Sequence, residues 1–204
     1  VQRKLLKWTV PGLAHLAAFW GFMFLLVTVI EGYGALFWRD FAIPVIGRQA
    51  WLGWLEDTMA LATAASVVGF AIIRVRNAPK NQGRSSRFFG SHLDAAWLVL
   101  FMIFNVVWTL LLYRGAQINT GYFPFERGAY ASEAVARALE PLGEDANTVI
   151  EHVGVLLALG VIFGFLVLVV HSKHMHIFTA PINVAVARRR PGGAGALGAL
   201  QPVY

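Results

Sequence analysis

The stretch VGVLLALGVIFGFLVLVV, residues 153–170, contains no charged side chain. It lies within a segment, residues 149–170, that is long enough to cross the hydrocarbon core of a bilayer, which takes about 20 apolar residues in a helix. Three further predominantly apolar segments precede it, at residues 12–30, 54–73 and 95–113. The sequence therefore predicts an all-α fold, a polytopic bundle of four transmembrane helices.

The composition agrees with a membrane protein. Hydrophobic residues make up 57% of the chain and charged residues 14%, whereas about 25% of the residues of a soluble domain are charged. The net charge is +6, but the basic residues are not gathered into a patch that could bind nucleic acid. Cysteine is absent, which excludes disulfides and an iron–sulfur ligand set within this chain. We expect membrane lipid, and no nucleic acid, as a partner.

The basic residues cluster before the first segment, between the second and third, and after the fourth. They are Arg3, Lys4, Lys7, Arg74, Arg76, Lys80, Arg84, Arg87, Lys173, Arg188, Arg189 and Arg190. The other two connections, residues 31–53 and 114–148, hold most of the acidic residues, Glu31 among them. The positive-inside rule then predicts a multi-pass protein of the cell membrane with both termini of this chain in the cytoplasm.

Smaller features predict local structure. The segment SEAVARALEPLG predicts a short helix that Ser132 caps and that ends at Pro141. Gly160 and Gly164 form a GxxxG pair, which favours close helix packing. Tyr113 lies at the end of a segment, where aromatic residues form a belt at the membrane interface.

Five of the six histidines fall at the predicted cytoplasmic ends of the helices: His15, His92, His171, His174 and His176. Any one of them could simply lie among lipid headgroups. His15 differs because it lies inside an apolar helix, where an ionisable group is costly and marks a functional site by default. We therefore expect a partner for the neutral imidazole of His15.

Helical geometry limits which histidine can be that partner. Each residue of a helix advances by about 100°, so His174 and His176 on one continuous helix face nearly opposite sides, and at most one can face His15. Two imidazoles from two helices at equal depth are what axial ligation of a b-type haem requires. A zinc site would need four ligands, and no cysteine is present to help. The residues predict a haem and leave the partner of His15 open.

Several segments carry a family resemblance. GLAHLAAFWG (12–21) and HIFTAPINV (176–184) resemble two helix ends of the cytochrome b (gamma) subunit of respiratory nitrate reductase. FGSHLDAAW (89–97), LLLYRGAQINTG (110–121) and SKHMHIFTAPINV (172–184) together resemble the membrane domain of heterodisulfide-reductase-related Fe–S oxidoreductases. This second resemblance extends over nearly the whole chain.

The resemblance implies a quinone-linked oxidoreductase of the electron-transfer flavoprotein:menaquinone type. It implies that His15 and His176 are the axial ligands of one haem b near the cytoplasm. The two ligands of the second haem of nitrate reductase would fall at Leu25 and Ala158, and neither side chain can bind iron. The family continues into a cytoplasmic domain that holds Fe–S clusters.

These expectations give the chain a domain plan. Residues 1–190 would form the transmembrane haem b domain, and the Gly- and Ala-rich residues 191–204 a linker toward an Fe–S domain outside this chain. The domain would pass electrons between that Fe–S module, supplied by electron-transfer flavoprotein, and menaquinone in a respiratory chain.

The quinone headgroup is expected in the cytoplasmic half of the bundle. No second haem is expected to carry electrons to the other face, so the quinone must approach the haem on the cytoplasmic side. Quinone reduction consumes protons, and histidine, with an ordinary pKa of about 6.5, suits proton transfer at neutral pH. His92 is the first candidate, with His174 second and Lys173 a possible headgroup donor.

Two other classes of function stay open. His92, His174 and Lys173 could instead form the relay of a proton- or metal-handling transporter. The chain could also be a membrane anchor subunit without a redox role.

Overall fold

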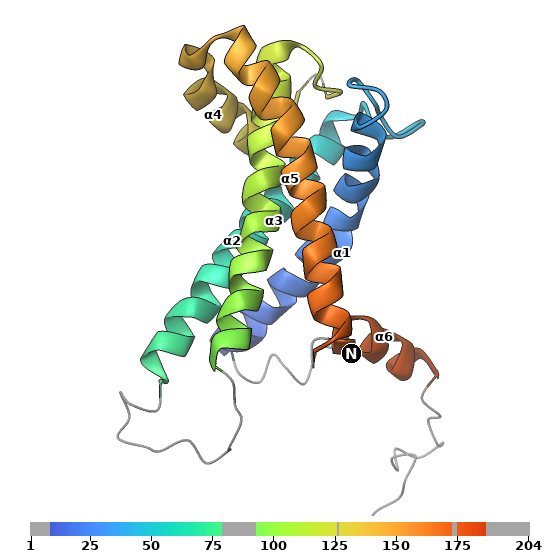
Figure 1. Cartoon of the computed structure of the whole chain (residues 1–204). Helices are drawn as coiled ribbons and strands as arrows, with labels where there is room; N and C mark the ends of the chain where they lie inside the picture. Colours follow the sequence, from blue (N-terminus) through green and yellow to red (C-terminus); the bar gives the residue numbers. More distant parts are fainter. Residues whose placement is uncertain (1–8, 79–92, 126, 173–174, 187–204) are drawn as a thin grey trace, which may run out of the picture. The chain divides into compact units, whose positions relative to one another are not determined.

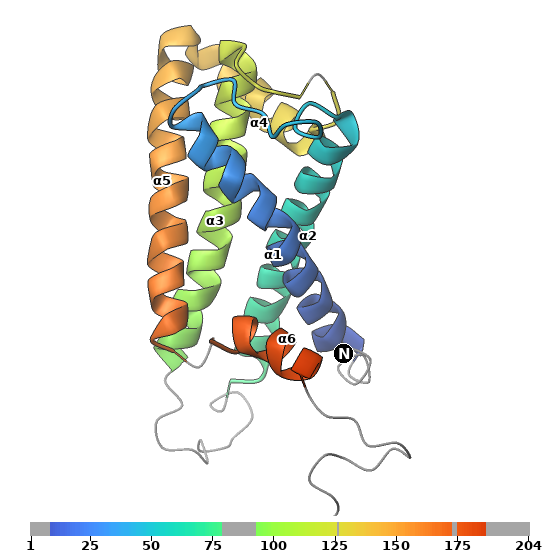
Figure 2. The same ribbon diagram turned by 90° about the vertical axis from the view of Figure 1, so that its right-hand side faces the viewer.

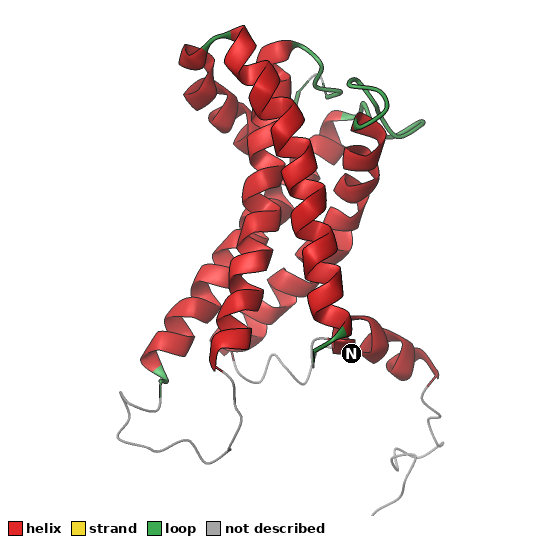
Figure 3. Cartoon of the chain, in the orientation of Figure 1, coloured by secondary structure: helices red, strands yellow, loops and turns green. Residues whose placement is uncertain are grey.

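The computed structural model describes residues 9–78, 93–125, 127–172 and 175–186, and these residues are helical with short connections and no strand (Figures 1 and 3). The elements are α1 (Thr9–Ala35), α2 (Ala50–Arg76), α3 (Leu93–Thr120), α4 (Tyr130–Leu139), the 3-10 turn η3 (Glu140–Leu142), α5 (Glu144–Val170) and α6 (His176–Val186). The prediction of an all-α fold is confirmed.

Four of these helices, α1, α2, α3 and α5, are long and apolar enough to cross a membrane. The four predicted spans are therefore confirmed, although the helices run past the predicted ends. Helix α1 continues to Ala35 and α3 to Thr120. Glu31 and Arg114, which the charge pattern assigns to connections, thus lie inside helices.

The chain divides into two compact units. The described residues up to Phe165 belong to the first unit, and those from Leu166 to Val186 belong to the second. The first unit holds α1 to α4, η3 and the greater part of α5. The second holds the last residues of α5 and helix α6.

The first unit exposes apolar side chains and buries charged ones. Phe101 is 63% exposed and Leu156 is 62% exposed, whereas Arg114 and Glu56 are each 1% exposed. Its apolar core joins residues of α1, α2, α3 and α5, with contributions from α4. An apolar outer surface is what a bundle surrounded by lipid requires, since lipid tails are the solvent there.

Close helix contacts in this unit depend on particular glycines. A Cβ atom at Gly154 of α5 would lie 2.8 Å from Tyr113 Cβ of α3, and α3 and α5 run side by side there (Figure 2). A Cβ atom at Gly160 would meet no described atom within 4 Å, and one at Gly164 would meet only Met102 Cε, at 3.2 Å. The predicted packing role is wrong for Gly160 among the described residues, whereas Gly164 lies close to Met102 of α3.

The prediction that Tyr113 belongs to the aromatic belt at the membrane interface is also wrong. Tyr113 is 4% exposed and belongs to the core cluster, so it is no interfacial belt residue. The reason is that α3 extends beyond it to Thr120, which places Tyr113 within the packed bundle.

The second unit corrects the reading of the histidine-rich segment. Helix α5 ends at Val170, and His171 and Ser172 lie in a turn. A separate helix, α6, then begins at His176 and contains Pro181 in its interior. The assumption of one continuous helix through these histidines is wrong, because α5 and α6 are separate helices. Proline costs α6 the hydrogen bond that residue 181 would donate to Ile177, and the short helix tolerates this loss.

Candidate functional site

Arg114 is the largest fully buried side chain among the described residues. Its Nη1 donates a hydrogen bond to Glu56 Oε2 of α2 over 2.9 Å, and its Nη2 lies 3.9 Å from Asp57 Oδ1. The rings of Phe123 and Phe125 have centroids 5.2 Å from the guanidinium carbon, a distance at which rings attract cations. Burial of a cation is tolerated because acidic and aromatic partners surround it.

Asp57 links α2 to the start of α4. The backbone N–H groups of Ala131 and Ser132 donate to Asp57 Oδ2, each over 2.8 Å, and Ser132 Oγ donates to Oδ1 over 2.8 Å. The first amides of a helix lack partners within the helix, and an anion is favourable beside them. The predicted short helix is confirmed, but Asp57 satisfies its first amides, and the prediction that Ser132 caps it is wrong.

Glu31 of α1 adds a third carboxyl group to this place. It is 6% exposed, and its side chain lies close to those of Glu56 and Arg114. Glu31 Oε1 and Glu56 Oε1 are both buried and accept no hydrogen bond from a described donor group. We call Glu31, Glu56, Asp57 and Arg114 the Arg114 cluster.

A small cavity lies beside the Arg114 cluster. Glu31, Tyr113, Arg114 and Gln117 supply its polar lining, and Phe41, Phe123 and Phe125 are among the residues that enclose it. About 10 Å³ is open to the centre of a water molecule, roughly what one water requires. The cavity can therefore hold a water molecule next to a carboxyl group and a guanidinium group.

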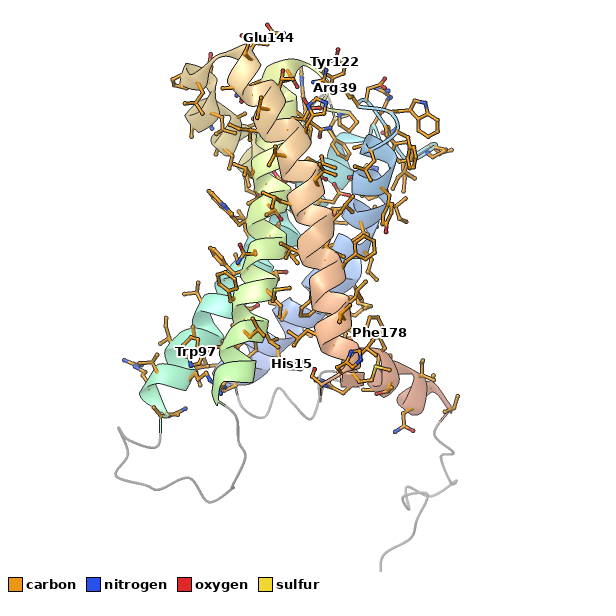
Figure 4. The ribbon with its side chains drawn as sticks, viewed as in Figure 1. His15, Arg39, Trp97, Tyr122, Glu144 and Phe178 are labelled. Atoms are coloured by element: carbon orange, nitrogen blue, oxygen red, sulfur yellow. The ribbon has the colours of Figure 1, made fainter. Side chains whose placement is uncertain are left out.

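A second polar network surrounds Glu151 of α5. Arg39 donates to both of its carboxylate oxygens, from Nε over 3.2 Å and from Nη2 over 2.7 Å, and Thr120 Oγ1 donates over 2.7 Å. The hydrogen bond with Glu151 raises the pKa of Arg39. The Arg39 guanidinium lies 3.7 Å from the centre of the Tyr122 ring, and Figure 4 shows these two residues next to each other. This network ties the connection after α1 to α3 and α5.

The predicted site residues lie elsewhere. His15 is half-buried on α1, toward the end of the bundle remote from Arg39 and Tyr122 (Figure 4). His176 is exposed as the first residue of α6 in the second unit, so its pairing with His15 stays a prediction. His92, Lys173 and His174 lie outside the described residues, as does the predicted linker 191–204.

The donor set of the described residues bears on what they could hold. No group of three or more His, Asp or Glu side chains among them is arranged to hold a metal ion. A b-type haem needs only two imidazoles, and His15 and His176 are donors of that kind. Leu25 and Ala158 are 6% and 5% exposed within the apolar core of the first unit.

Sequence reasoning missed the Arg114 cluster and Glu151. The signal was present, because Glu56, Asp57 and Glu151 lie inside predicted apolar spans, where ionisable residues mark functional sites by default. Glu31 and Arg114 were assigned to connections because the predicted spans ended too early. What no pattern shows is that side chains from three helices meet.

These features define a multi-pass helical membrane protein with a buried charged cluster. The chain is similar to a curated protein of Bacillus subtilis named "Probable iron-sulfur-binding oxidoreductase FadF", with 29% identity over 200 residues. The similarity covers 94% of this chain and 26% of that relative, so the chain spans about a quarter of its length. No protein-family model matches the chain, and no solved structure matches it.

Proposed function

We propose that this chain is the membrane electron-transfer domain of a quinone-linked oxidoreductase. The observation that carries the proposal is the similarity of nearly the whole chain to a protein named as an oxidoreductase. The four membrane-spanning helices support it, because a quinone dissolves in the bilayer and must be met there. A redox role is the coarse conclusion, and the following paragraphs make it specific.

In this proposal His15 and His176 hold one b-type haem near the cytoplasm. Imidazole nitrogens are neutral donors that suit haem iron. When bound, the haem would supply one-electron chemistry, while the chain supplies the two ligands and an apolar surrounding. The leucine and alanine at positions 25 and 158 lie in a packed apolar core, which supports a single haem rather than two.

The partners in this proposal lie outside the chain. The relative's name says that it binds iron–sulfur, and this chain has no cysteine. We therefore place the Fe–S clusters in a cytoplasmic domain or subunit that receives electrons from electron-transfer flavoprotein. The acceptor is menaquinone, with His92, His174 and Lys173 beside its headgroup.

A reduced-minus-oxidised absorption spectrum of the purified chain tests the haem. We expect the bands of a low-spin haem b, one haem per chain by pyridine haemochrome, and loss of the bands in His15→Ala and in His176→Ala. His152→Ala is the matched control, because His152 is exposed and its Nδ1 lies 2.7 Å from Thr148 O of its own helix. A wild-type chain without haem, or an unchanged spectrum in His176→Ala, would overturn the assignment.

A proton-handling protein is the second candidate, and one observation favours it. The Arg114 cluster places three carboxyl groups in membrane-spanning helices, and intramembrane carboxyl groups are typical of proton pathways. A haem-free wild-type spectrum would favour this function, or that of a redox-inactive anchor, over electron transfer.

A further inference from the structure

The Arg114 cluster holds more acidic groups than its described partners can balance. Asp57 receives three hydrogen bonds from the start of α4, and Arg114 donates to Glu56. Among the described residues, the charged neighbours of Glu31 are Glu56 and Arg114, and Arg114 already donates a hydrogen bond to Glu56 of α2. A second buried carboxylate beside Glu56 would be costly, because like charges this close strongly disfavour double ionisation.

The contact between Glu31 and Glu56 adds a chemical argument. An ionised carboxylate has no hydrogen to donate, so two carboxyl groups can share a hydrogen bond only if one of them carries a proton. The side chains of Glu31 and Glu56 lie close enough to interact, and a proton on one of them would let the pair form such a bond. Tyr113 of α3 also lies near both carboxyl groups. Its hydroxyl group is a further possible hydrogen-bond donor to them.

We propose that Glu31 and Glu56 hold one proton between them, and that the cavity beside Glu31 is where this proton exchanges with water. On release, the O–H bond of the carboxyl group breaks and the proton passes to a water molecule. The resulting carboxylate faces Arg114, whose Nε and Nη2 are buried and donate to no described acceptor. The N–H groups on these two nitrogen atoms stabilise the ionised state.

A route for the proton to solvent follows from a second cavity. Ile118, Gly121, Arg127 and Glu133 line this outer cavity together with Phe123 and Phe125, which also line the cavity beside Glu31. About 180 Å³ of the outer cavity is open to the centres of water molecules, room for several of them. The two cavities thus share Phe123 and Phe125 as lining residues, and the proposed route for the proton passes these two side chains.

This inference goes beyond the proposed electron-transfer function and does not require it. A proton on Glu31 and Glu56 is a property of the first unit alone, whether or not a haem is bound. Its test can therefore succeed or fail independently of the haem spectrum.

Infrared spectroscopy of the full chain in lipid tests the proposal. We expect, at a neutral pH where exposed carboxyl groups are ionised, a carbonyl band of a protonated carboxyl group that shifts in D₂O. The band should be lost in Glu31→Gln and retained in Glu140→Gln, because Glu140 is exposed at the end of α4. Absence of the band from the wild type, or its survival in Glu31→Gln, would overturn the proposal.

A second measurement covers the case in which the band cannot be assigned. Unfolding at neutral pH in weak buffer exposes all carboxyl groups, whose ordinary pKa is about 4.3, so a buried shared proton is released into solution. Glu31→Gln should release about one proton fewer per chain than the wild type, while Glu140→Gln should match the wild type. Equal release from Glu31→Gln and wild type would contradict the shared proton.

Discussion

Arg114 of α3 and Glu56 of α2 form an ion pair that is almost wholly buried. The Nη1–Oε2 distance is 2.9 Å, and the two side chains are 2% and 1% exposed. Removing one partner of such a pair leaves an uncompensated charge, which costs about 3–5 kcal/mol. Single substitutions in this pair therefore measure how strongly a buried charge depends on its partner.

We expect Arg114→Met to lower the free energy of unfolding by about 3–5 kcal/mol, because Glu56 loses its cation and Asp57 its nearest guanidinium. Arg48→Met is the control, since Arg48 pairs with Asp40 at 3.6 Å with both side chains more than 60% exposed. An exposed pair contributes about 0–1 kcal/mol. Chemical denaturation in detergent measures both, and equal losses would contradict the role of burial.

Asp57→Ala should loosen α4 selectively. The substitution removes the acceptors of three hydrogen bonds at the start of a helix of 10 residues, and loss of a cap alone costs about 0.5–2 kcal/mol. Hydrogen exchange of residues 130–139 should accelerate. The control is Asp145→Ala, at an exposed position in the first turn of α5, which should leave hydrogen exchange in α4 unchanged. If Asp145→Ala accelerated exchange in α4 to a similar extent, the result would argue against Asp57 as the cap of α4.

Gly154→Ala and Gly160→Ala form a matched pair on one helix. The new Cβ atom at position 154 would lie 2.8 Å from Tyr113 Cβ, whereas the one at position 160 meets no described atom within 4 Å. Overpacking costs about 1–3 kcal/mol, while alanine in an open helix position gains up to about 1 kcal/mol over glycine. Thermal unfolding should shift in opposite directions, and a loss at both positions would show that the outer face of α5 is covered.

The four spans could be predicted from the sequence because each is a long apolar run, and run length alone separates membrane helices from buried ones. The ends of the spans could not. Helices α1 and α3 extend past the last apolar residue because Glu31 and Arg114 find partners on neighbouring helices. A hydropathy pattern places the end of a span at such residues, because it contains no information about the partner side chains that make their burial possible.

The prediction for the histidine-rich segment, residues 171–176, was wrong for a different reason. The rotation of about 100° per residue holds only within one continuous helix. Helix α5 ends at Val170, one residue before His171. The hydrogen bond between His171 Nδ1 and Val167 O, at 2.9 Å, and the polar residues that follow favour a turn there. The argument that at most one of His174 and His176 can face His15 therefore no longer applies, and substitution of His176 decides the assignment instead.

Glu151→Gln should destabilise the connection between α1 and α2, because Arg39 loses a two-point ion pair whose Glu151 side chain is 4% exposed. The pKa of Arg39 is raised above its ordinary value by its hydrogen bond with Glu151, so the stabilisation is fully present below the ordinary arginine pKa of the unfolded chain and is lost only as the pH rises through the folded pKa. The difference in unfolding free energy between wild type and Glu151→Gln should thus stay constant from about pH 7 to about pH 9. Unfolding measured across that range checks this, with the exposed Asp40→Asn as control, and a difference that shrinks toward pH 9 would mean that another group carries the cation.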